Sequence, residues 1–499
     1  MWTSRLQAAG GDPISLLRGS RRHLPFRPAP GDRRAEPCGA RPRSFPTGAP
    51  RGGMLEQCTD PRQIPLPALK QRSASMAEQL ALRGGKRTVP EGFIRPWPEV
   101  TEADRQAVMA VFDSPRITDQ QWAQSAGLAQ EWAAYMGVKH CIPVNSGTAA
   151  LHLCVGGLGI EAGDEVIVPA FTFWASAAAV LHHNAIPVFV DIDPRTYCMD
   201  PALIEAAITE RTRAIMPVHI HGMPADMDPI LAIARKHGLG VIEDVAQAHG
   251  ARYKGRLCGS MGDAAGYSTQ ASKTLSSGCQ GGLFTTNDDA IHDRAAQLQY
   301  FGERVTVGRE REEQQYNAHG LGWMYRGDMF SQAFVRSQLK RLDANNALRV
   351  RNCRYLTEHL RRIPGIETPY VPPECEPVYY NYVVGFNPAA AGLDVSALTM
   401  REKCQEALKA EGVPVGQWQR RSVPAQDVFQ KRIGYGHGCP WSCRPNAPVY
   451  RIEDYPRAND FVDSHCYVFD VNPPNGLELM GLYVAAFQKV MGNLDQVFA

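Results

Sequence analysis

Between residues 140 and 244 the sequence alternates short apolar segments with segments of helical length. The expected strands are 140–144, 165–168, 187–191, 214–220 and 240–244. An expected helix follows each of the first four strands, the fourth of these helices starting near Met227 and the third at Pro201. Such alternation builds βαβ units, so it predicts an α/β domain with a parallel or mostly parallel sheet covered by helices on both faces.

The composition changes along the chain and divides it into four parts. Residues 1–75 are rich in Arg, Pro and Gly and have no hydrophobic periodicity, so burial cannot offset their ordering entropy. We expect them to be disordered or to result from an upstream start codon, with Met54 and Met76 as alternative starts; a transit peptide is the third reading. The capping-box pattern Thr101–Asp104 marks the first expected helix. The remaining expected parts are an N-terminal arm at 76–114, a large domain at 115–340 and a small α+β domain at 341–499.

Overall composition is that of a globular protein. Of the 499 residues 44% are hydrophobic and 21% charged, and the longest apolar runs are strand-sized, far short of the roughly 20 residues of a membrane span. The net charge is +2, but the first 53 residues hold ten Arg against three acids, which leaves 2 − 7 = −5 for the rest. A mildly acidic body argues against nucleic acid as a partner. The 13 scattered cysteines favour reduced thiols and a cytoplasmic location.

Three short fragments carry residues with chemical potential. Ser146–Thr148 stands where a strand gives way to a helix, so it is either an anion cradle or an ordinary helix cap. Asp244 ends a buried strand, where α/β sheets bind ligands, although a cap or an ion pair is an alternative. Lys273 lies among Ser, Thr and Gly and is either a reactive amine or a surface group. A phosphate cradle, an anionic partner for a ring nitrogen and an imine-forming amine are together the parts that pyridoxal 5′-phosphate (PLP) requires.

From about Ala77 to its end the chain resembles the DegT/DnrJ/EryC1/StrS family of sugar aminotransferases. The landmarks, in order, are 145–152, 163–173, 187–193, 217–219, 242–250 and 322–326. This resemblance implies the type I fold of PLP-dependent transferases: a large domain with a mostly parallel seven-stranded sheet, and a smaller C-terminal α+β domain.

The resemblance also implies roles for seven residues. Lys273 would form the imine with the cofactor, Asp244 would pair with the pyridinium nitrogen, and Phe173 would stack on the ring, with Trp174 as its rival. The other implied cofactor contacts are Gly147, Thr148 and Ser268 at the phosphate and Gln247 near the ring hydroxyl. An ionised Asp244 keeps the ring nitrogen protonated, which lets the ring accept electrons from the breaking Cα–H bond. Lys273 and Asp244 are therefore the expected catalytic residues.

Several positions around the expected site depart from the family pattern. A His is missing from the segment before Lys273, and the following 278–282 segment is one residue longer and lacks an acid. Met324 replaces an Asn that would reach a neighbouring subunit's cofactor. These departures leave the expected catalytic pair intact and concern the acceptor substrate.

The resemblance implies a reaction. The expected enzyme moves an amino group from glutamate or glutamine to a keto-sugar, with or without an attached nucleotide, or to a keto-cyclitol, and acts as a homodimer. One alternative is a PLP- or pyridoxamine-phosphate-dependent sugar dehydratase of the same fold, against which Lys273 counts because that branch typically has His at this position. The other is a cofactor-binding sensor without turnover.

The Cys439–Cys443 loop invites a metal or redox interpretation. Two cysteines separated by three residues do not supply a four-ligand zinc site, so we expect no metal. We expect instead that this Pro-Trp loop packs near the active site and shapes the substrate pocket. His219, His221 and His249 lie at strand ends, and a structural role is the favoured reading for each.

Overall fold

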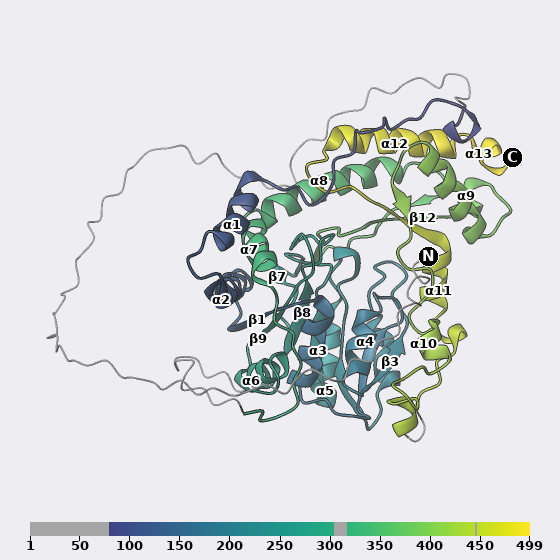
Figure 1. Cartoon of the computed structure of the whole chain (residues 1–499). Helices are drawn as coiled ribbons and strands as arrows, with labels where there is room; N and C mark the ends of the chain where they lie inside the picture. Colours follow the sequence, from purple (N-terminus) through teal and green to yellow (C-terminus); the bar gives the residue numbers. More distant parts are fainter. Residues whose placement is uncertain (1–78, 304–316, 445–446) are drawn as a thin grey trace, which may run out of the picture. The chain divides into compact units, whose positions relative to one another are not determined.

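The computed structural model describes residues 79–303, 317–444 and 447–499, so the expectation for residues 1–75 falls outside the described part. Its largest sheet has seven strands in the order β1-β9-β8-β5-β4-β2-β3 (Figure 1). These strands are β1 (His140–Val144), β2 (Glu165–Pro169), β3 (Ile186–Val190), β4 (Thr212–Ile215), β5 (Gly240–Asp244), β8 (Ala264–Ser268) and β9 (Gly282–Thr286). Only β9 pairs antiparallel with its neighbours; the other pairings are parallel. The predicted mostly parallel sheet is confirmed.

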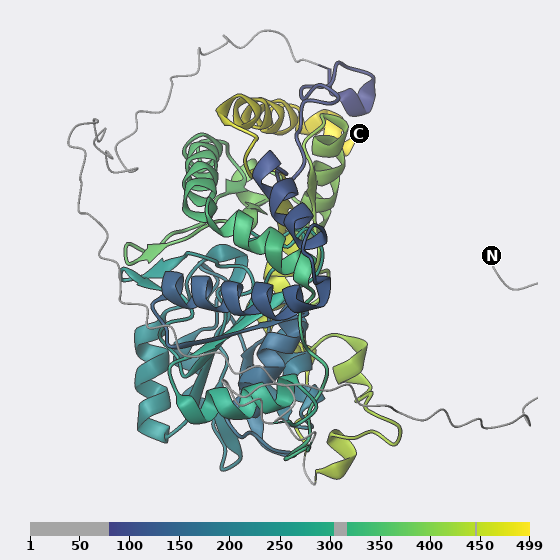
Figure 2. The same ribbon diagram turned by 60° about the vertical axis from the view of Figure 1, so that its left-hand side comes forward.

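Helices cover both faces of this sheet (Figure 2). Side chains alternate between the faces of a strand, and β8 shows it: a Cβ on Gly266 would meet Leu151 of α3, whereas Tyr267 packs edge-on against Trp132 of α2. Helices α4 and α6 pack beside α3. The helices of this half of the chain are α1 (Glu102–Phe112), α2 (Ile117–Met136), α3 (Gly147–Gly157), α4 (Ala175–His182), α5 (Met227–His237) and α6 (Asp289–Gln299).

A second, four-stranded antiparallel sheet forms the centre of the C-terminal part, in the order β10-β12-β14-β13. Its strands are β10 (Ile366–Glu367), β12 (Tyr382–Phe386), β13 (Val415–Gly416) and β14 (His465–Val468), and the third sheet consists of β6 (Arg252–Tyr253), β7 (Arg256–Leu257) and β11 (Cys375–Glu376). The helices are α7 (Met329–Leu339), α8 (Leu342–Leu360), α9 (Ala397–Ala410), α10 (Asp427–Gln430), α11 (Pro456–Ser464), α12 (Leu477–Met491) and α13 (Leu494–Phe498). The long helices α8 and α12 pack against each other.

Two hydrophobic cores correspond to the two larger sheets. The N-terminal arm belongs to the second core, because Leu80 and Val89 are buried there and Ala81 N–H donates to Glu411 at 2.7 Å. Val423, Trp441 and other residues of the C-terminal part are buried in the first core. The domain boundary near residue 340 stays a prediction, and the packing indicates that segments from both ends of the chain cross it.

Two local expectations are wrong. The helix expected from Pro201 is two short 3₁₀ turns, because the few residues between the Asp200 cap and β4 close i→i+3 hydrogen bonds such as Ile204 N–H to the Pro201 carbonyl. The strand expected over 214–220 ends at Ile215, because Pro217 has no N–H for the ladder.

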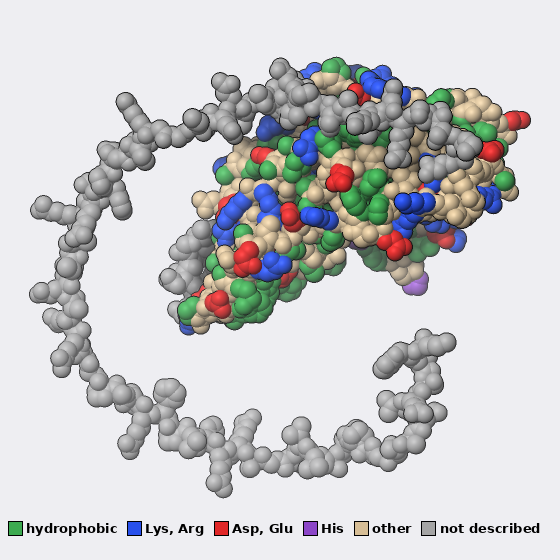
Figure 3. All heavy atoms as spheres, turned by 90° about the horizontal axis from the view of Figure 1, so that it is seen from above, with side chains coloured by type: hydrophobic (Ala, Val, Ile, Leu, Met, Phe, Trp, Pro, Cys, Tyr) green, Lys and Arg blue, Asp and Glu red, His purple; other side chains and the backbone are tan. Residues whose placement is uncertain are grey.

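The surface of the described part is mixed. Seen from above Figure 1, basic and acidic side chains are interspersed with apolar ones on the visible face (Figure 3). Within residues 79–303, 317–444 and 447–499, no helix combines the length and the apolar character needed to cross a membrane.

Candidate active site

The carboxyl ends of β1, β2, β5 and β8 lie along one edge of the large sheet, because these strands run in the same direction. The register pairs Asp244, the last residue of β5, with Gly266, two residues before the end of β8. The predicted residues that follow these strands are therefore brought together, in the place where α/β sheets bind ligands.

The start of α3, the predicted phosphate-binding position, lies against the end of β8. Ser146 caps the helix, its Oγ accepting a hydrogen bond from the Ala149 N–H at 3.1 Å. Gly147 is buried, and a Cβ at this position would lie 2.6 Å from Cβ of Ser268, so only glycine permits this close approach. Thr148 is the next residue of the same first turn, whose backbone amides have no carbonyl partner earlier in the helix. The arrangement suits a phosphate group.

Asp244 is buried, and two hydrogen bonds hold its carboxyl group in place. Its side chain is only 4% exposed, Oδ2 accepts from Ser176 Oγ at 2.7 Å, and Oδ1 accepts from the Ala246 N–H at 3.0 Å. Burial raises the pKa of Asp244, and the hydrogen bonds and the Lys273 ammonium oppose this shift without cancelling it. A cationic ring N–H bound here would stabilise the ionised form.

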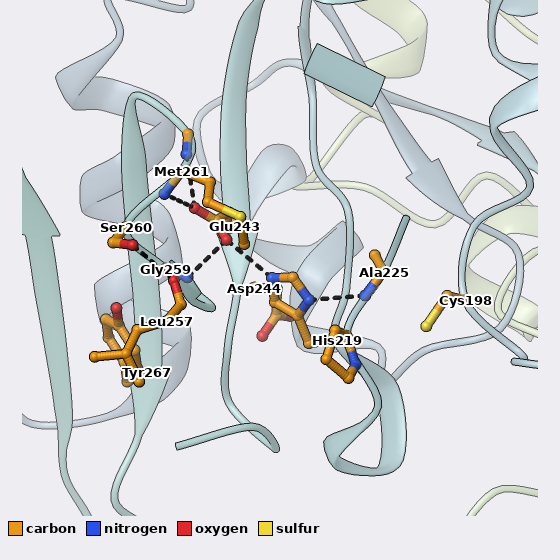
Figure 4. Close-up of polar contacts among 12 residues, drawn as sticks. Cys198, His219, Ala225, Glu243, Asp244, Leu257, Gly259, Ser260, Met261 and Tyr267 are labelled. Carbon is orange, nitrogen blue, oxygen red and sulfur yellow. Dashed lines mark hydrogen bonds and ion pairs between the residues drawn. The ribbon is translucent and has the colours of Figure 1, made fainter. Parts of the chain in front are cut away.

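A buried polar pair fixes the strand end that carries Asp244. Nδ1 of His219 accepts from the Ala225 N–H at 2.9 Å, so Nε2–H donates to Glu243 at 3.0 Å (Figure 4). The Glu243 carboxylate also accepts from the N–H groups of Gly259, Met261 and Gly262. Burial would raise the pKa of Glu243, but these hydrogen bonds outweigh burial and lower it. The His219 N–H donates to the Asp244 carbonyl at 3.0 Å, so the pair holds the backbone at the candidate site.

Lys273 lies in the loop after β8 and meets residues from distant parts of the chain. Its Nζ is 4.3 Å from the centroid of the Tyr380 ring, and Tyr380 OH lies 3.1 Å from Ser272 Oγ. Its carbonyl oxygen accepts from Trp97 Nε1 at 3.0 Å. No local sequence pattern indicated Tyr380 or Trp97.

The aromatic and amide residues expected around the ring also lie at this edge. Phe173 is 52% exposed and lies 6.0 Å, ring centroid to centroid, from Trp418. Trp174, the rival for stacking, is partly buried against the large core, so Phe173 offers the freer ring face. Gln247 is buried, and its Oε1 accepts from the His221 N–H at 2.7 Å. The individual roles of these residues stay predictions.

The Cys439–Cys443 loop is not part of this site, and the expectation that it shapes the substrate pocket of its own chain is wrong. Cys439 contacts Asn184, just before β3, and Arg444 forms a 2.6 Å ion pair with Glu165, the first residue of β2. These are the amino ends of the strands, at the opposite edge of the sheet from Asp244. The buried ion pair anchors the loop there.

The residues at the carboxyl edge fit PLP in their donor set. The cradle at Gly147 and Ser268 suits the phosphate, the Asp244 carboxylate suits a protonated ring nitrogen, and the exposed Phe173 ring suits a planar face. Lys273 supplies the amine. Fit alone indicates a cofactor class but does not give the reaction.

Comparison with known proteins gives a consistent answer. Residues 98–454 match the model of the DegT/DnrJ/EryC1/StrS aminotransferase family. L-glutamine:scyllo-inosose aminotransferase of Streptomyces griseus is 38% identical over 438 residues, which are 85% of this chain and 100% of that protein. GDP-perosamine synthase of Caulobacter vibrioides is 42% identical over 273 residues, 53% of this chain and 71% of that protein.

Solved structures share the fold. S. venezuelae DesV has a TM-score of 0.66 at 31% identity, covering 78% of this chain and 94% of its own. The aminotransferase from Psychrobacter cryohalolentis has a TM-score of 0.70 at 28% identity, covering 81% of this chain and 100% of its own. The fold is thus type I of PLP-dependent transferases, as predicted. This chain belongs to the DegT/DnrJ/EryC1/StrS aminotransferase family, and it is a PLP-dependent aminotransferase.

Proposed function

We propose that this enzyme transfers the amino group of L-glutamine to the ketone of a cyclitol of the scyllo-inosose type. The observation that carries the proposal is that Lys273 and the buried Asp244 lie at one sheet edge, near enough for the Lys273 ammonium to oppose the rise in the pKa of Asp244, in a chain that aligns with the whole length of a glutamine:scyllo-inosose aminotransferase. A nucleotide-linked keto-sugar is the second candidate acceptor, because GDP-perosamine synthase is 42% identical over a shorter alignment.

The proposed chemistry assigns a task to each residue at the site. Bound PLP would supply an electron sink and carry the amino group between the two half-reactions. Lys273 Nζ would take the proton from Cα of the amino donor and, in the second half-reaction, deliver a proton to the former carbonyl carbon of the acceptor. Asp244 would hold the proton on the ring nitrogen, and the amides of Gly147 and Thr148 would bind the phosphate together with Ser268.

The proposal includes a homodimer in the cytoplasm. Large apolar side chains are exposed in the segment before Arg326, with Leu321 at 92% and Met324 at 43%, and also on α1 and α2, where Phe112 is 55% exposed. Such a surface fits a subunit interface. The free state of the eleven described cysteines suits a reducing compartment. On the one face that Figure 3 shows, basic and acidic side chains are interspersed and do not gather in a basic stripe, which supports a small-molecule substrate over nucleic acid.

The two alternatives predict different outcomes. A dehydratase would remove water from the sugar and would form no C–N bond. Lys273 argues against this alternative. A sensor would bind the cofactor and leave glutamine unchanged. Following the amino nitrogen of glutamine therefore distinguishes both alternatives from amino transfer.

The direct test follows the amino nitrogen into product. The PLP-loaded protein is incubated with L-glutamine labelled with ¹⁵N at the α-amino group and with scyllo-inosose, and the products are analysed by mass spectrometry. The proposal expects a ¹⁵N-labelled aminocyclitol and the 2-oxo acid of glutamine in equal amounts. A GDP-linked 4-keto sugar run in parallel tests the second acceptor. If only the GDP-linked sugar is aminated, or if neither acceptor is, the proposed cyclitol substrate is wrong.

A further inference from the structure

Two hydroxyl groups form a hydrogen-bonded chain to Asp244: Thr172, in the loop after β2, and Ser176, in the first turn of α4. Thr172 Oγ1 lies 2.8 Å from Ser176 Oγ, and Ser176 Oγ lies 2.7 Å from Asp244 Oδ2. Both hydroxyl residues are essentially inaccessible to solvent, Ser176 at 0% and Thr172 at 1% exposure. Ser176 is the one polar residue between Ala175 and Leu181 of α4.

The hydrogen-bond directions follow from the charge of Asp244. Ser176 Oγ has two acceptors within reach, Asp244 Oδ2 at 2.7 Å and the Phe173 carbonyl oxygen at 3.2 Å. A carboxylate only accepts, so the single Ser176 hydroxyl proton goes to Oδ2, which is the nearer acceptor and the charged one. The Ser176 oxygen is then left to accept from Thr172. The order of donation is therefore Thr172 to Ser176 to Asp244, and each bond strengthens the next in a site of low polarity.

We propose that Ser176, supported by Thr172, is a positioning residue that keeps the Asp244 carboxylate ionised and aimed at the cofactor's ring nitrogen. With Oδ1 held by the Ala246 N–H and Oδ2 held by Ser176, the plane of the carboxylate is fixed from both sides. The inference rests on the proposed pairing of Asp244 with that nitrogen.

The remaining groups around Asp244 do not replace Ser176. Among the influences that favour ionisation, the Ser176 hydrogen bond is the largest, followed by Ala246 N–H, Lys273 and His219. Cys154 of α3 also faces Asp244, and its thiol stays neutral because burial raises its pKa well above the usual value. Burial still raises the pKa of Asp244 overall. Loss of the Ser176 hydrogen bond, the largest influence that opposes burial, should therefore raise this pKa further.

The first measurement is spectroscopic. The wild type and Ser176→Ala are loaded with PLP labelled with ¹⁵N at the ring nitrogen, and the chemical shift of that nitrogen is followed from pH 6 to pH 9. The proposal expects a protonated shift in the wild type and a displacement towards the unprotonated value in Ser176→Ala. Thr172→Val should displace the shift in the same direction by less.

The matched control is Thr285→Val. Thr285 is also 1% exposed and lies on β9 of the same sheet, but its hydroxyl is near Tyr267 rather than Asp244. The ¹⁵N shift of the PLP ring nitrogen in Thr285→Val should equal that in the wild type. Circular dichroism shows which variants fold, and if Ser176→Ala does not, Thr172→Val against Thr285→Val decides the question.

The second measurement is kinetic. The rate of the half-reaction with L-glutamine should fall on the order of 10-fold in Ser176→Ala. In an Asp244→Asn background the same change should have little further effect, because the two residues act as a unit. Wild-type ¹⁵N shifts in Ser176→Ala and Thr172→Val, or a full additional loss in the Asp244→Asn background, overturn the inference. A wild type that never protonates the ring nitrogen or does not react with glutamine overturns the proposed function instead.

Discussion

The indole Nε1 of Trp97 donates a hydrogen bond to the carbonyl oxygen of Lys273 at 3.0 Å. Trp97 belongs to the N-terminal arm, and its ring also lies 5.3 Å from the guanidinium carbon of the buried Arg349. The arm therefore contacts the backbone of the residue expected to form the imine, which links a segment remote in sequence to the position of the reactive amine.

Removing this contact should impair catalysis more than cofactor binding. In Trp97→Phe the ring remains over Arg349 but the donor to Lys273 is lost, so the loop after β8 is less well held. We expect kcat to fall by roughly three- to tenfold, the equivalent of about one hydrogen bond, with the affinity for PLP within twofold of the wild type. Steady-state kinetics and a cofactor titration check this. An unchanged kcat would mean that the contact does not position Lys273.

Two truncations should show that residues 1–75 are dispensable and that the N-terminal arm is not. A protein starting at Met76 keeps Leu80 and Val89 in the second core and the hydrogen bond from Ala81 to Glu411, so it should be soluble, yellow and active. A protein starting at Pro98 loses all of these and leaves the buried Glu411–Lys489 pair open, so its melting temperature should fall. Aggregation of the Met76 protein, or equal stability of both truncations, contradicts this prediction.

Asp104 should make part of the stability pH-dependent. Burial alone would raise its pKa, but hydrogen bonds from Arg341, Ser337 and Thr101 outweigh burial and lower the pKa from 3.8 to about 2. A carboxyl whose pKa is lower in the folded state contributes stability that is present above pH ~4 and is lost as the pH falls towards about 2. Asp104→Asn should therefore cost about 2 kcal/mol at pH 7, with a smaller cost at pH 3.

Denaturant unfolding of Asp104→Asn and wild type at pH 7 and pH 3 measures this difference. Glu102→Gln is the control, because Glu102 lies in the same first turn of α1 and its partner Arg105 is exposed. It should change the free energy of unfolding by less than about 0.5 kcal/mol at either pH. A cost for Asp104→Asn that does not shrink at pH 3 would show that the charge is not its source.

Asp244→Asn tests whether the carboxylate acts on the cofactor or only on the fold. The change preserves size and one acceptor oxygen but removes the charge that would keep the ring nitrogen protonated. We expect the half-reaction with the amino donor to slow by on the order of 10²-fold or more, while the melting temperature changes little. A lowered melting temperature with near-normal turnover would indicate a structural cap instead.

The parts of the fold that the sequence predicted well are those with a local signal. The strands 140–144 and 240–244 have the expected bounds because each is a short, largely apolar segment of strand length. Asp244 and the cradle at Gly147 follow strands with a common direction, so their meeting at one edge was also predictable. The turns after Pro201 were missed because a short segment can close either 3₁₀ or α-helical hydrogen bonds.

The parts that were missed depend on contacts between distant segments. Tyr380 and Trp97 reach Lys273 from the segment just before β12 and from the arm, and nothing in their own sequence neighbourhood marks them. Ser176 lies in the alanine-rich helix α4, and the feature that indicates a role for it is its hydrogen bond to Asp244 on β5. The Cys439 loop was misplaced because its position depends on the ion pair of Arg444 with Glu165, 279 residues earlier in the chain.

The identity of the imine-forming lysine is the most direct test of the proposed active site. The PLP-loaded protein is reduced with borohydride, digested and mapped by mass spectrometry, and Lys273→Ala is treated in parallel. We expect one pyridoxyl label, on Lys273, in the wild type, and no label and no amino transfer in a folded Lys273→Ala protein. A label on another lysine, or amino transfer that survives in Lys273→Ala, would contradict the proposed active site.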